Sequence, residues 1–115
     1  MKNYPVSPDL STPRGYNHVV TASGTMVFVA GQISMDKDGN IVGAGDLRAQ
    51  TTQVLENVKA ALAAAGATFG DVVKMNTYVV NLTPDALPII REVRTQYFPA
   101  ENPPASTDRK STRLN

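Results

Sequence analysis

The chain has no cysteine and a single histidine among its 115 residues. Without cysteine it can form no disulfide framework, no thiol nucleophile and no thiolate metal site. His18 cannot build a metal site alone, and the sequence offers no carboxylate cluster to help it. No spacing places His18 beside a particular serine, so we do not expect a Ser-His-Asp triad. We therefore expect a protein that holds no metal.

An excess of one charge is also absent, because the formal net charge is only +1. A nearly neutral body lacks the electrostatic footprint of a nucleic-acid-binding protein. No apolar run approaches the ~20 residues of a membrane span, and the polar, proline-rich N-terminus does not resemble a secretory signal. With 42% hydrophobic and 18% charged residues, the chain can build a core. We expect one cytoplasmic domain that binds neither nucleic acid nor membrane.

Hydrophobic patterning predicts three strands, over residues 16–22, 25–33 and 72–80. The first two strands, with Ser23-Gly24 between them, are typical of a β-hairpin. Asp-Gly within residues 36–40 predicts a second turn, after which Ile41-Val42 returns as a short edge strand.

Two amphipathic helices complete the pattern. The first begins at Gly45-Asp46 and ends at Gly66, which suits a left-handed C-cap. The second follows Asp85, and its apolar stripe runs to Phe98 before Pro99 ends it. Arg91 and Arg94 fall on the polar face of this helix, where we expect them to be solvated.

The predicted fold class is α/β (α+β), with a sheet that carries two helices on one face. Both faces of strand 25–33 are apolar, since Val27 and Val29 point one way and Met26 and Phe28 the other. Two helices cover one face only, so the other must be buried elsewhere. This pattern predicts self-association through the bare sheet faces.

The end of the chain differs from the rest. Pro103-Pro104 should lead into a further strand, yet residues 108–115 are polar and lack apolar periodicity. We assign residues 1–107 to an incomplete domain whose C-terminal strands are missing, and residues 108–115 to a tail of artefactual origin. On this assignment, the unpaired sheet edges leave the 115-residue form poorly stable.

Few residues suggest chemistry. Gly31 inside an apolar strand indicates a bulge or the close approach of a ligand, and Gln32 adds an amide at the strand end. Taken alone, a plain strand terminus is the simpler explanation of both residues. Tyr16 could line a pocket or cap the core.

A set of short segments occurs in a fixed order along the chain: Gly15-Tyr16, Gly24-x-Met26-Val27-Phe28-Val29-Ala30-Gly31-Gln32-Ile33, Asp38-Gly39, Gln50-Thr51, Asn57-Val58-Lys59, Ala65-Gly66, Asp71-Val72-Val73-Lys74, Tyr97-Phe98-Pro99 and Pro103-Pro104-Ala105. This ordered set resembles the RidA (YjgF-like) reactive-intermediate deaminase family. Together they cover about residues 10–107 of the chain.

The resemblance implies a chorismate-mutase-like domain that forms homotrimers with pockets for small metabolites between subunits. It also implies hydrolysis of an enamine or imine, such as 2-aminoacrylate, to a carbonyl compound and ammonia without cofactor or metal. By resemblance, the substrate-binding residues are Tyr16, Gly31, Gln32, Phe98, Asn102 and Ser106. The sequence identifies no catalytic residue.

The chain departs from the family at three places. Ser106 stands where deaminating members carry an arginine that grips the substrate carboxylate, and a hydroxyl cannot replace that bidentate cation. Ala30 stands where a serine is usual, and the two C-terminal strands with their glutamate have no counterpart. Arg14, beside Tyr16, is one candidate for a replacement cation.

These departures leave three functions open. The first is a deaminase with an altered substrate or weak activity, and the second is a non-catalytic metabolite-binding or regulatory protein of the same fold. The third is a ribonuclease, against which the neutral body and the lack of an acid–base pair both count.

Overall fold

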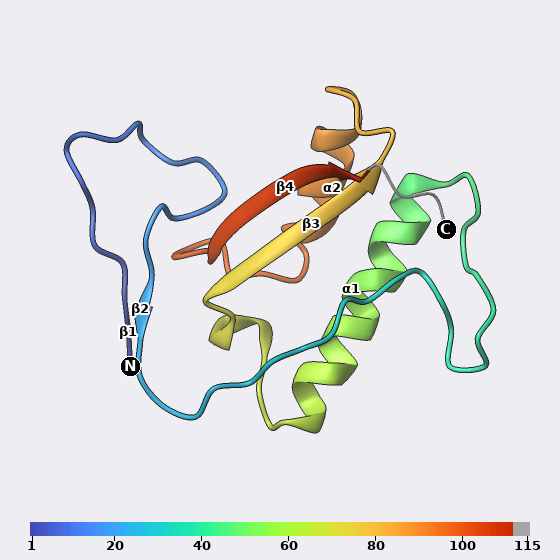
Figure 1. Cartoon of the computed structure of the whole chain (residues 1–115), viewed down its shortest axis with the longest axis horizontal. Helices are drawn as coiled ribbons and strands as arrows, with labels where there is room; N and C mark the ends of the chain where they lie inside the picture. Colours follow the sequence, from blue (N-terminus) through green and yellow to red (C-terminus); the bar gives the residue numbers. More distant parts are fainter. Residues whose placement is uncertain (112–115) are drawn as a thin grey trace.

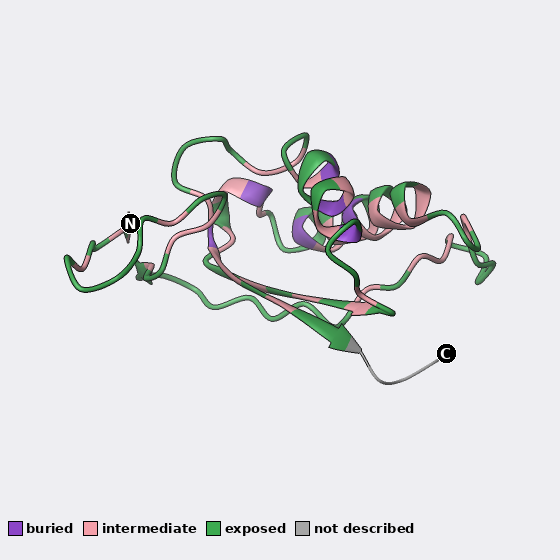
Figure 2. Ribbon diagram, turned by 90° about the horizontal axis from the view of Figure 1, so that it is seen from above, coloured by how far each residue is buried: buried purple, intermediate pink, exposed green. Residues whose placement is uncertain are grey.

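The computed structural model describes residues 1–111 of the chain. Along the chain it places β1 (Lys2–Asn3), β2 (Thr21–Ala22), α1 (Leu47–Ala64), the 3-10 helix η1 (Phe69–Asp71), β3 (Lys74–Val80), α2 (Ala86–Arg94) and β4 (Ala105–Ser111). Helices α1 and α2 contact each other and lie on one face of the β3–β4 pair (Figures 1 and 2). The predicted α+β class, with two helices on one face of a sheet, is confirmed.

Local signals fix both ends of α1. The Asp46 side chain accepts a hydrogen bond from the Ala49 N–H at 3.0 Å and so caps the helix. At the other end Gly66 has φ +74°, and the Ala67 N–H reaches back to the Leu62 carbonyl at 2.9 Å. Only a glycine adopts this turn without strain, which confirms the predicted start and stop.

Helix α2 is shorter than its apolar stripe predicted. It ends at Arg94, and Tyr97 and Phe98 follow in a turn. Both rings pack edge-to-face on Phe69, with centroids 5.5 and 4.8 Å away. They join the main core cluster, whose buried members are Leu55, Leu62, Phe69 and Val93 (Figure 2). The stripe therefore identified the core residues but not the end of the helix.

Strands β3 and β4 pair in parallel, from Lys74 opposite Ala105 to Val80 opposite Ser111. Burial alternates along β3, with Met75, Thr77 and Val79 facing the helices and the intervening residues exposed. The strand expected after Pro103-Pro104 therefore exists. The strand also continues over residues 108–111, which the sequence patterning had placed in the tail. Hydrogen bonds between parallel strands join backbone groups, so a polar sequence can continue the pairing. Residues 112–115 lie outside the described residues.

The predicted hairpin of residues 16–22 with 25–33 is wrong. Only Thr21–Ala22 forms a strand, and it pairs antiparallel with Lys2–Asn3. The Ser23 N–H donates to the Met1 carbonyl at 3.2 Å, so the N-terminus takes the position expected for residues 25–33. Residues 24–33 have no strand assignment and run past the edge of β3 (Figure 1).

The turn at residues 36–40 is confirmed. The Asp36 side chain accepts hydrogen bonds from the Asp38 and Asn40 N–H groups, and Gly39 has φ +86°. Beyond it the returning chain makes one antiparallel bridge, between Met35 and Ile41. From α1, the Asn57 amide donates to the Ile33 and Met35 carbonyls at 3.0 and 2.8 Å and holds this part of the chain against the helix.

Apolar side chains are exposed on the side away from the helices. On residues 24–33, Met26 and Phe28 are 76% and 84% exposed, and Tyr78 on β3 is 63% exposed. The uncovered apolar surface that the patterning predicted is therefore present on the single chain. No helix within residues 1–111 has the length and hydropathy needed to cross a membrane.

Candidate functional site

Two adjoining hollows lie where the N-terminal loop meets α2 and β4. The smaller one, about 130 Å³, has a polar lining and is called here the polar hollow; its walls include Arg14, Tyr16, Arg91, Arg94, Ser106 and Asp108. The larger one, about 350 Å³, is called the apolar hollow; its walls include Met75, Phe98, Pro99, Ala100, Pro103 and Pro104. Arg14, Arg91 and Arg94 line both.

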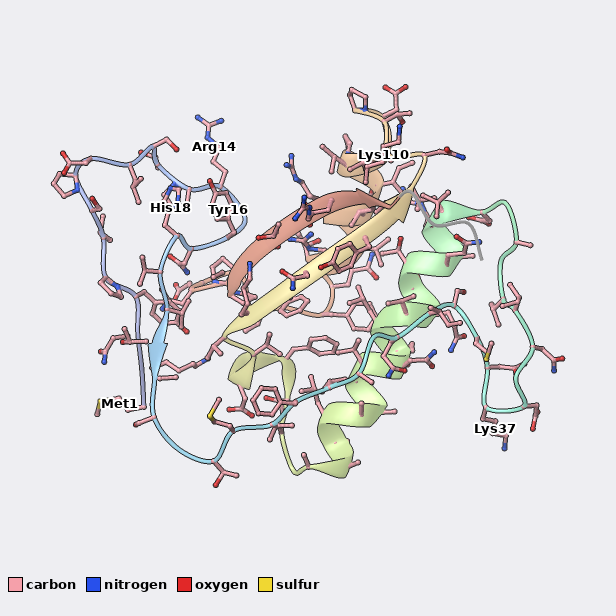
Figure 3. The ribbon with its side chains drawn as sticks, viewed as in Figure 1. Met1, Arg14, Tyr16, His18, Lys37 and Lys110 are labelled. Carbon is pink, nitrogen blue, oxygen red and sulfur yellow. The ribbon has the colours of Figure 1, made fainter. Side chains whose placement is uncertain are left out.

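Hydrogen bonds from Asn17 hold the N-terminal loop at this position. Its backbone N–H donates to the Pro104 carbonyl at 3.2 Å, and its side-chain amide donates to the Pro103 carbonyl at 2.6 Å. Within the loop, Tyr16 and His18 stack edge-to-face, and His18 Nε2 is 2.8 Å from the Ser11 carbonyl (Figure 3). These contacts place Arg14 and Tyr16 beside the start of β4.

Arg94 connects the helix layer to β4. It is the last residue of α2, and its Nη1 donates to Asp108 Oδ1 at 3.1 Å. Its Nη2 donates to Ser106 Oγ at 3.4 Å. Alternation along β4 brings Ser106 and Asp108 to the same face, so one guanidinium reaches both. The side chains of Arg94 and Asp108 are only 12% and 22% exposed.

Positive charge dominates the polar hollow. Three guanidinium groups line it against the single carboxylate of Asp108, which pairs with Arg94. Arg14 and Arg91 are exposed and stand at the same hollow. A guanidinium binds carboxylate and phosphate groups through two parallel hydrogen bonds, so this arrangement is suited to an anion.

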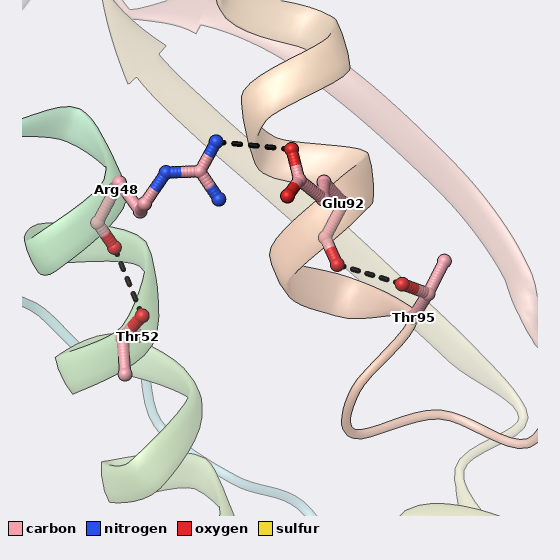
Figure 4. A network of polar contacts seen from close by, with 4 residues as sticks. All are labelled: Arg48, Thr52, Glu92 and Thr95. Atoms are coloured by element: carbon pink, nitrogen blue, oxygen red, sulfur yellow. Dashed lines mark hydrogen bonds and ion pairs between the residues drawn. The ribbon is translucent and has the colours of Figure 1, made fainter.

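The displaced pKa values among residues 1–111 belong to other contacts. The Asn40 backbone N–H lowers the pKa of Asp36, and burial, followed by a hydrogen bond with Glu56, raises the pKa of Tyr97. A hydrogen bond from Arg48 at 3.0 Å lowers the pKa of Glu92 and links α1 to α2 (Figure 4). These groups support a turn, the core and the contact between the helices.

The structure brings some of the predicted site residues together. Tyr16 and Ser106 line the polar hollow, and Phe98 lines the apolar one. Arg14, the candidate replacement cation, borders both. Gly31 and Gln32 lie outside the walls, and the Gln32 amide donates to the Ala30 carbonyl at 3.2 Å instead. Asn102 is exposed, with φ +55°.

Arg91, Arg94 and Asp108 are the charged site residues that sequence reasoning missed. The expectation that Arg94 is solvated is wrong, whereas Arg91 is exposed as expected. Arg94 follows the buried Ile90 by four residues, a spacing that places two side chains on one face of a helix. That spacing was the signal in the sequence that the Arg94 side chain is largely buried. No local pattern connected Asp108 to Arg94. Residues 1–111 hold no group of three His, Cys, Asp or Glu that could bind a metal.

The fold and site together define an α+β domain with a cationic hollow between an N-terminal loop, a helix and a strand. The chain belongs to the Endoribonuclease L-PSP family, whose profile matches residues 7–115. This match confirms the resemblance to RidA-like proteins. It also spans residues 108–115, whose assignment to a tail stays a prediction.

Individual proteins support the same family. A RutC family protein of Pyrococcus horikoshii is 38% identical over 115 residues, covering 99% of this chain and 88% of that protein. One from Pyrococcus abyssi is 41% identical over 91 residues, covering 79% and 69%. The crystal structure of the Rid family protein YyfB from Yersinia pestis superposes with a TM-score of 0.88 at 36% identity, covering 98% of this chain and 87% of that one.

Proposed function

We propose that this protein hydrolyses a 2-imino acid, or its enamine tautomer, to a 2-oxo acid and ammonia at the polar hollow. The observation that carries the proposal is the hydrogen bond from Arg94 to the Ser106 hydroxyl. By resemblance, Ser106 occupies the position of the arginine that grips the substrate carboxylate. Here the Arg94 guanidinium, at the end of α2, donates to Ser106 and so lies next to that position.

The contacts of Ser106 suit this role. Because Arg94 donates to its Oγ, the Ser106 hydroxyl proton remains available for an acceptor in the hollow. A carboxylate bound there would receive hydrogen bonds from both groups, with Arg14 and Arg91 adding charge from the remaining wall.

The reaction requires the site mainly to orient the substrate and the attacking water. Water adds to the imine carbon, the C–N bond of the resulting carbinolamine breaks, and ammonia leaves while the carbonyl forms. The imine carbon is already electrophilic, so holding the acid group fixes that carbon where water can attack. The polar hollow offers groups that can hold the acid end of the substrate in this way.

The proposal includes assembly as a homotrimer whose pockets lie beside the seams between subunits. It is supported by the exposed apolar side chains on residues 24–33 and on β3, since large uncovered apolar patches mark interfaces. Replacing Phe28, which is 84% exposed, with serine should convert the assembly to smaller species in sedimentation-velocity experiments. Lys37→Ser in the exposed turn is the control. A parent chain that sediments as a monomer would rule out the trimer.

Activity is tested with 2-iminobutyrate, generated in place by an amino acid oxidase and followed by its disappearance in a semicarbazide-trapping assay. We expect hydrolysis above the spontaneous rate. Loss of a charge-assisted bond is worth about 1.5–3 kcal/mol, so Arg94→Gln should lower kcat/KM roughly 10- to 150-fold. Arg48→Gln makes the same change in an exposed pair and should leave kcat/KM within about twofold. Spontaneous rates in the parent protein, both with this imine and with the bulkier imine made from leucine by the same oxidase, would refute the deaminase.

The same protein samples distinguish the deaminase from the alternative, a metabolite-binding protein without turnover. In that case 2-oxobutyrate would raise the melting temperature of the parent, but not of Arg94→Gln, while no imine is consumed. Ribonuclease activity finds less support here, since His18, the single histidine, lies outside the walls of both hollows.

A further inference from the structure

The two hollows share Gly15 and three arginines in their walls but differ in chemistry. Arg14, Arg91 and Arg94 border both of them. On the polar side these residues meet Ser106 and Asp108. On the other side they meet side chains without charge, from Met75 on β3 and from the segment that leads into β4. A molecule bound at the arginines can therefore extend from one hollow into the other.

We propose that the substrate carries a large apolar side chain, branched alkyl or aromatic, that lies in the apolar hollow while its acid group lies among the arginines. This inference rests on the proposed function and deepens it, because it names the class of imino acid. The polar hollow would bind the acid group of the substrate. The apolar hollow would bind its side chain, and a substrate whose side chain is only a methyl group would leave this hollow unfilled.

The size of the apolar hollow supports a bulky group. It measures about 350 Å³, whereas an apolar cavity of about 150 Å³ is enough to bind benzene. Phe98 offers a ring face or edge for contact with an aromatic or branched group, and Pro103 and Pro104 add rigid apolar surface. The alkyl stems of the arginines extend this surface while their charged ends remain at the acid group.

The competing occupant of the apolar hollow is a side chain from a second copy of this protein. The shared arginines favour the small molecule, because they place a cationic end beside the apolar wall, and an imino acid has complementary acidic and apolar ends. Occupation by a second copy would instead exclude large ligands, so ligand size decides between the two.

The test uses stable 2-oxo acids, which are the products of the proposed reaction, and isothermal titration calorimetry on the whole protein. The ligands are pyruvate, 4-methyl-2-oxopentanoate and phenylpyruvate. We expect the Kd of 4-methyl-2-oxopentanoate to be at least about tenfold lower than that of pyruvate, since a single methylene in an apolar pocket already contributes about tenfold or more. Phenylpyruvate should show the same preference.

Each result is decisive. Pyruvate binding as tightly as the larger acids would overturn the inference and leave the proposed function standing, and it would indicate that a second copy fills the hollow. If no 2-oxo acid binds and no imine is hydrolysed, the proposed function and the inference both fail.

A filling substitution locates the side chain. Ala100 is exposed at the edge of the apolar hollow, so Ala100→Phe should fold while it occupies that space. It should reduce the ratio of the pyruvate Kd to the 4-methyl-2-oxopentanoate Kd to about three or less. Ala63→Phe, at an exposed position of α1, should keep the parent ratio. An unchanged ratio in Ala100→Phe would place the apolar group elsewhere and overturn the inference.

Discussion

Replacing Asp108 with asparagine tests whether β4 and its partner on α2 belong to one folded unit. The substitution keeps the size of the side chain but removes the charge that faces Arg94 at 3.1 Å. The guanidinium then stays in a largely buried position without its counter-ion. We expect the free energy of unfolding to fall, because the unfolded chain solvates Arg94 freely and the folded chain does not.

The exposure of the two side chains sets the magnitude. Exposed ion pairs contribute about 0.2–1 kcal/mol, and removing one partner of a fully buried pair costs about 3–5 kcal/mol. At 12% and 22% exposure the Arg94–Asp108 pair lies between these limits. We expect a loss of about 2 kcal/mol. With a urea m-value of about 2 kcal/mol/M, the midpoint falls by about 1 M.

Urea unfolding followed by circular dichroism at fixed protein concentration measures the change. Asp85→Asn is the matched control, since Asp85 is exposed and makes no side-chain cap at α2. In the double variant with Arg94→Gln, the loss should be smaller than the sum of the single losses, because the unpaired charge is gone. A midpoint within about 0.2 M of the parent for Asp108→Asn would refute the reasoning.

Three further substitutions address the helices. Asp46→Ala removes the cap of α1 and should cost about 1 kcal/mol in urea unfolding, and the absence of any loss would contradict the cap. Gly43→Ala should cost more than about 1 kcal/mol, because φ is +70° and a Cβ would stand 2.7 Å from the Ala49 Cβ; a neutral result would contradict this close approach. Arg48→Gln should lower the urea midpoint slightly at neutral pH. The lowered pKa of Glu92 means that this pair stabilises the fold above the ordinary value of 4.5 and that the effect is lost as pH falls below it, so a difference from the parent that persists in acid would count against the pair.

Elements with local signals were predictable from the sequence. The cap at Asp46 and the glycine at Gly66 mark α1 because their geometry depends on neighbouring residues alone. The strand at residues 72–80 was also predictable, because its apolar and β-branched residues form a local pattern. Residues 24–33 show the opposite case. Their pattern is typical of a strand, but a strand needs a partner backbone, and the N-terminal residues took the place beside β2.

The site depended on contacts that no local pattern encodes. Tyr16, Phe98 and Ser106 were predicted through a family resemblance, and the structure places them at the two hollows. Arg94 was misjudged because its charge was taken as a sign of exposure, although it follows the buried Ile90 by four residues. Its ion pair exists because β4 runs beside β3 and presents Asp108 to the end of α2.

The parallel pairing of β3 and β4 also constrains the order of folding. The two strands cannot be joined by a tight turn, so the chain through α2 must cross over before their ladder can close. Arg94 lies within this crossover and Ser106 directly after it, which means that these two residues of the polar hollow meet only once this long loop has closed. Such non-local closure is a slow event. Recovery of 2-oxo acid binding during refolding should therefore lag behind recovery of helical signal.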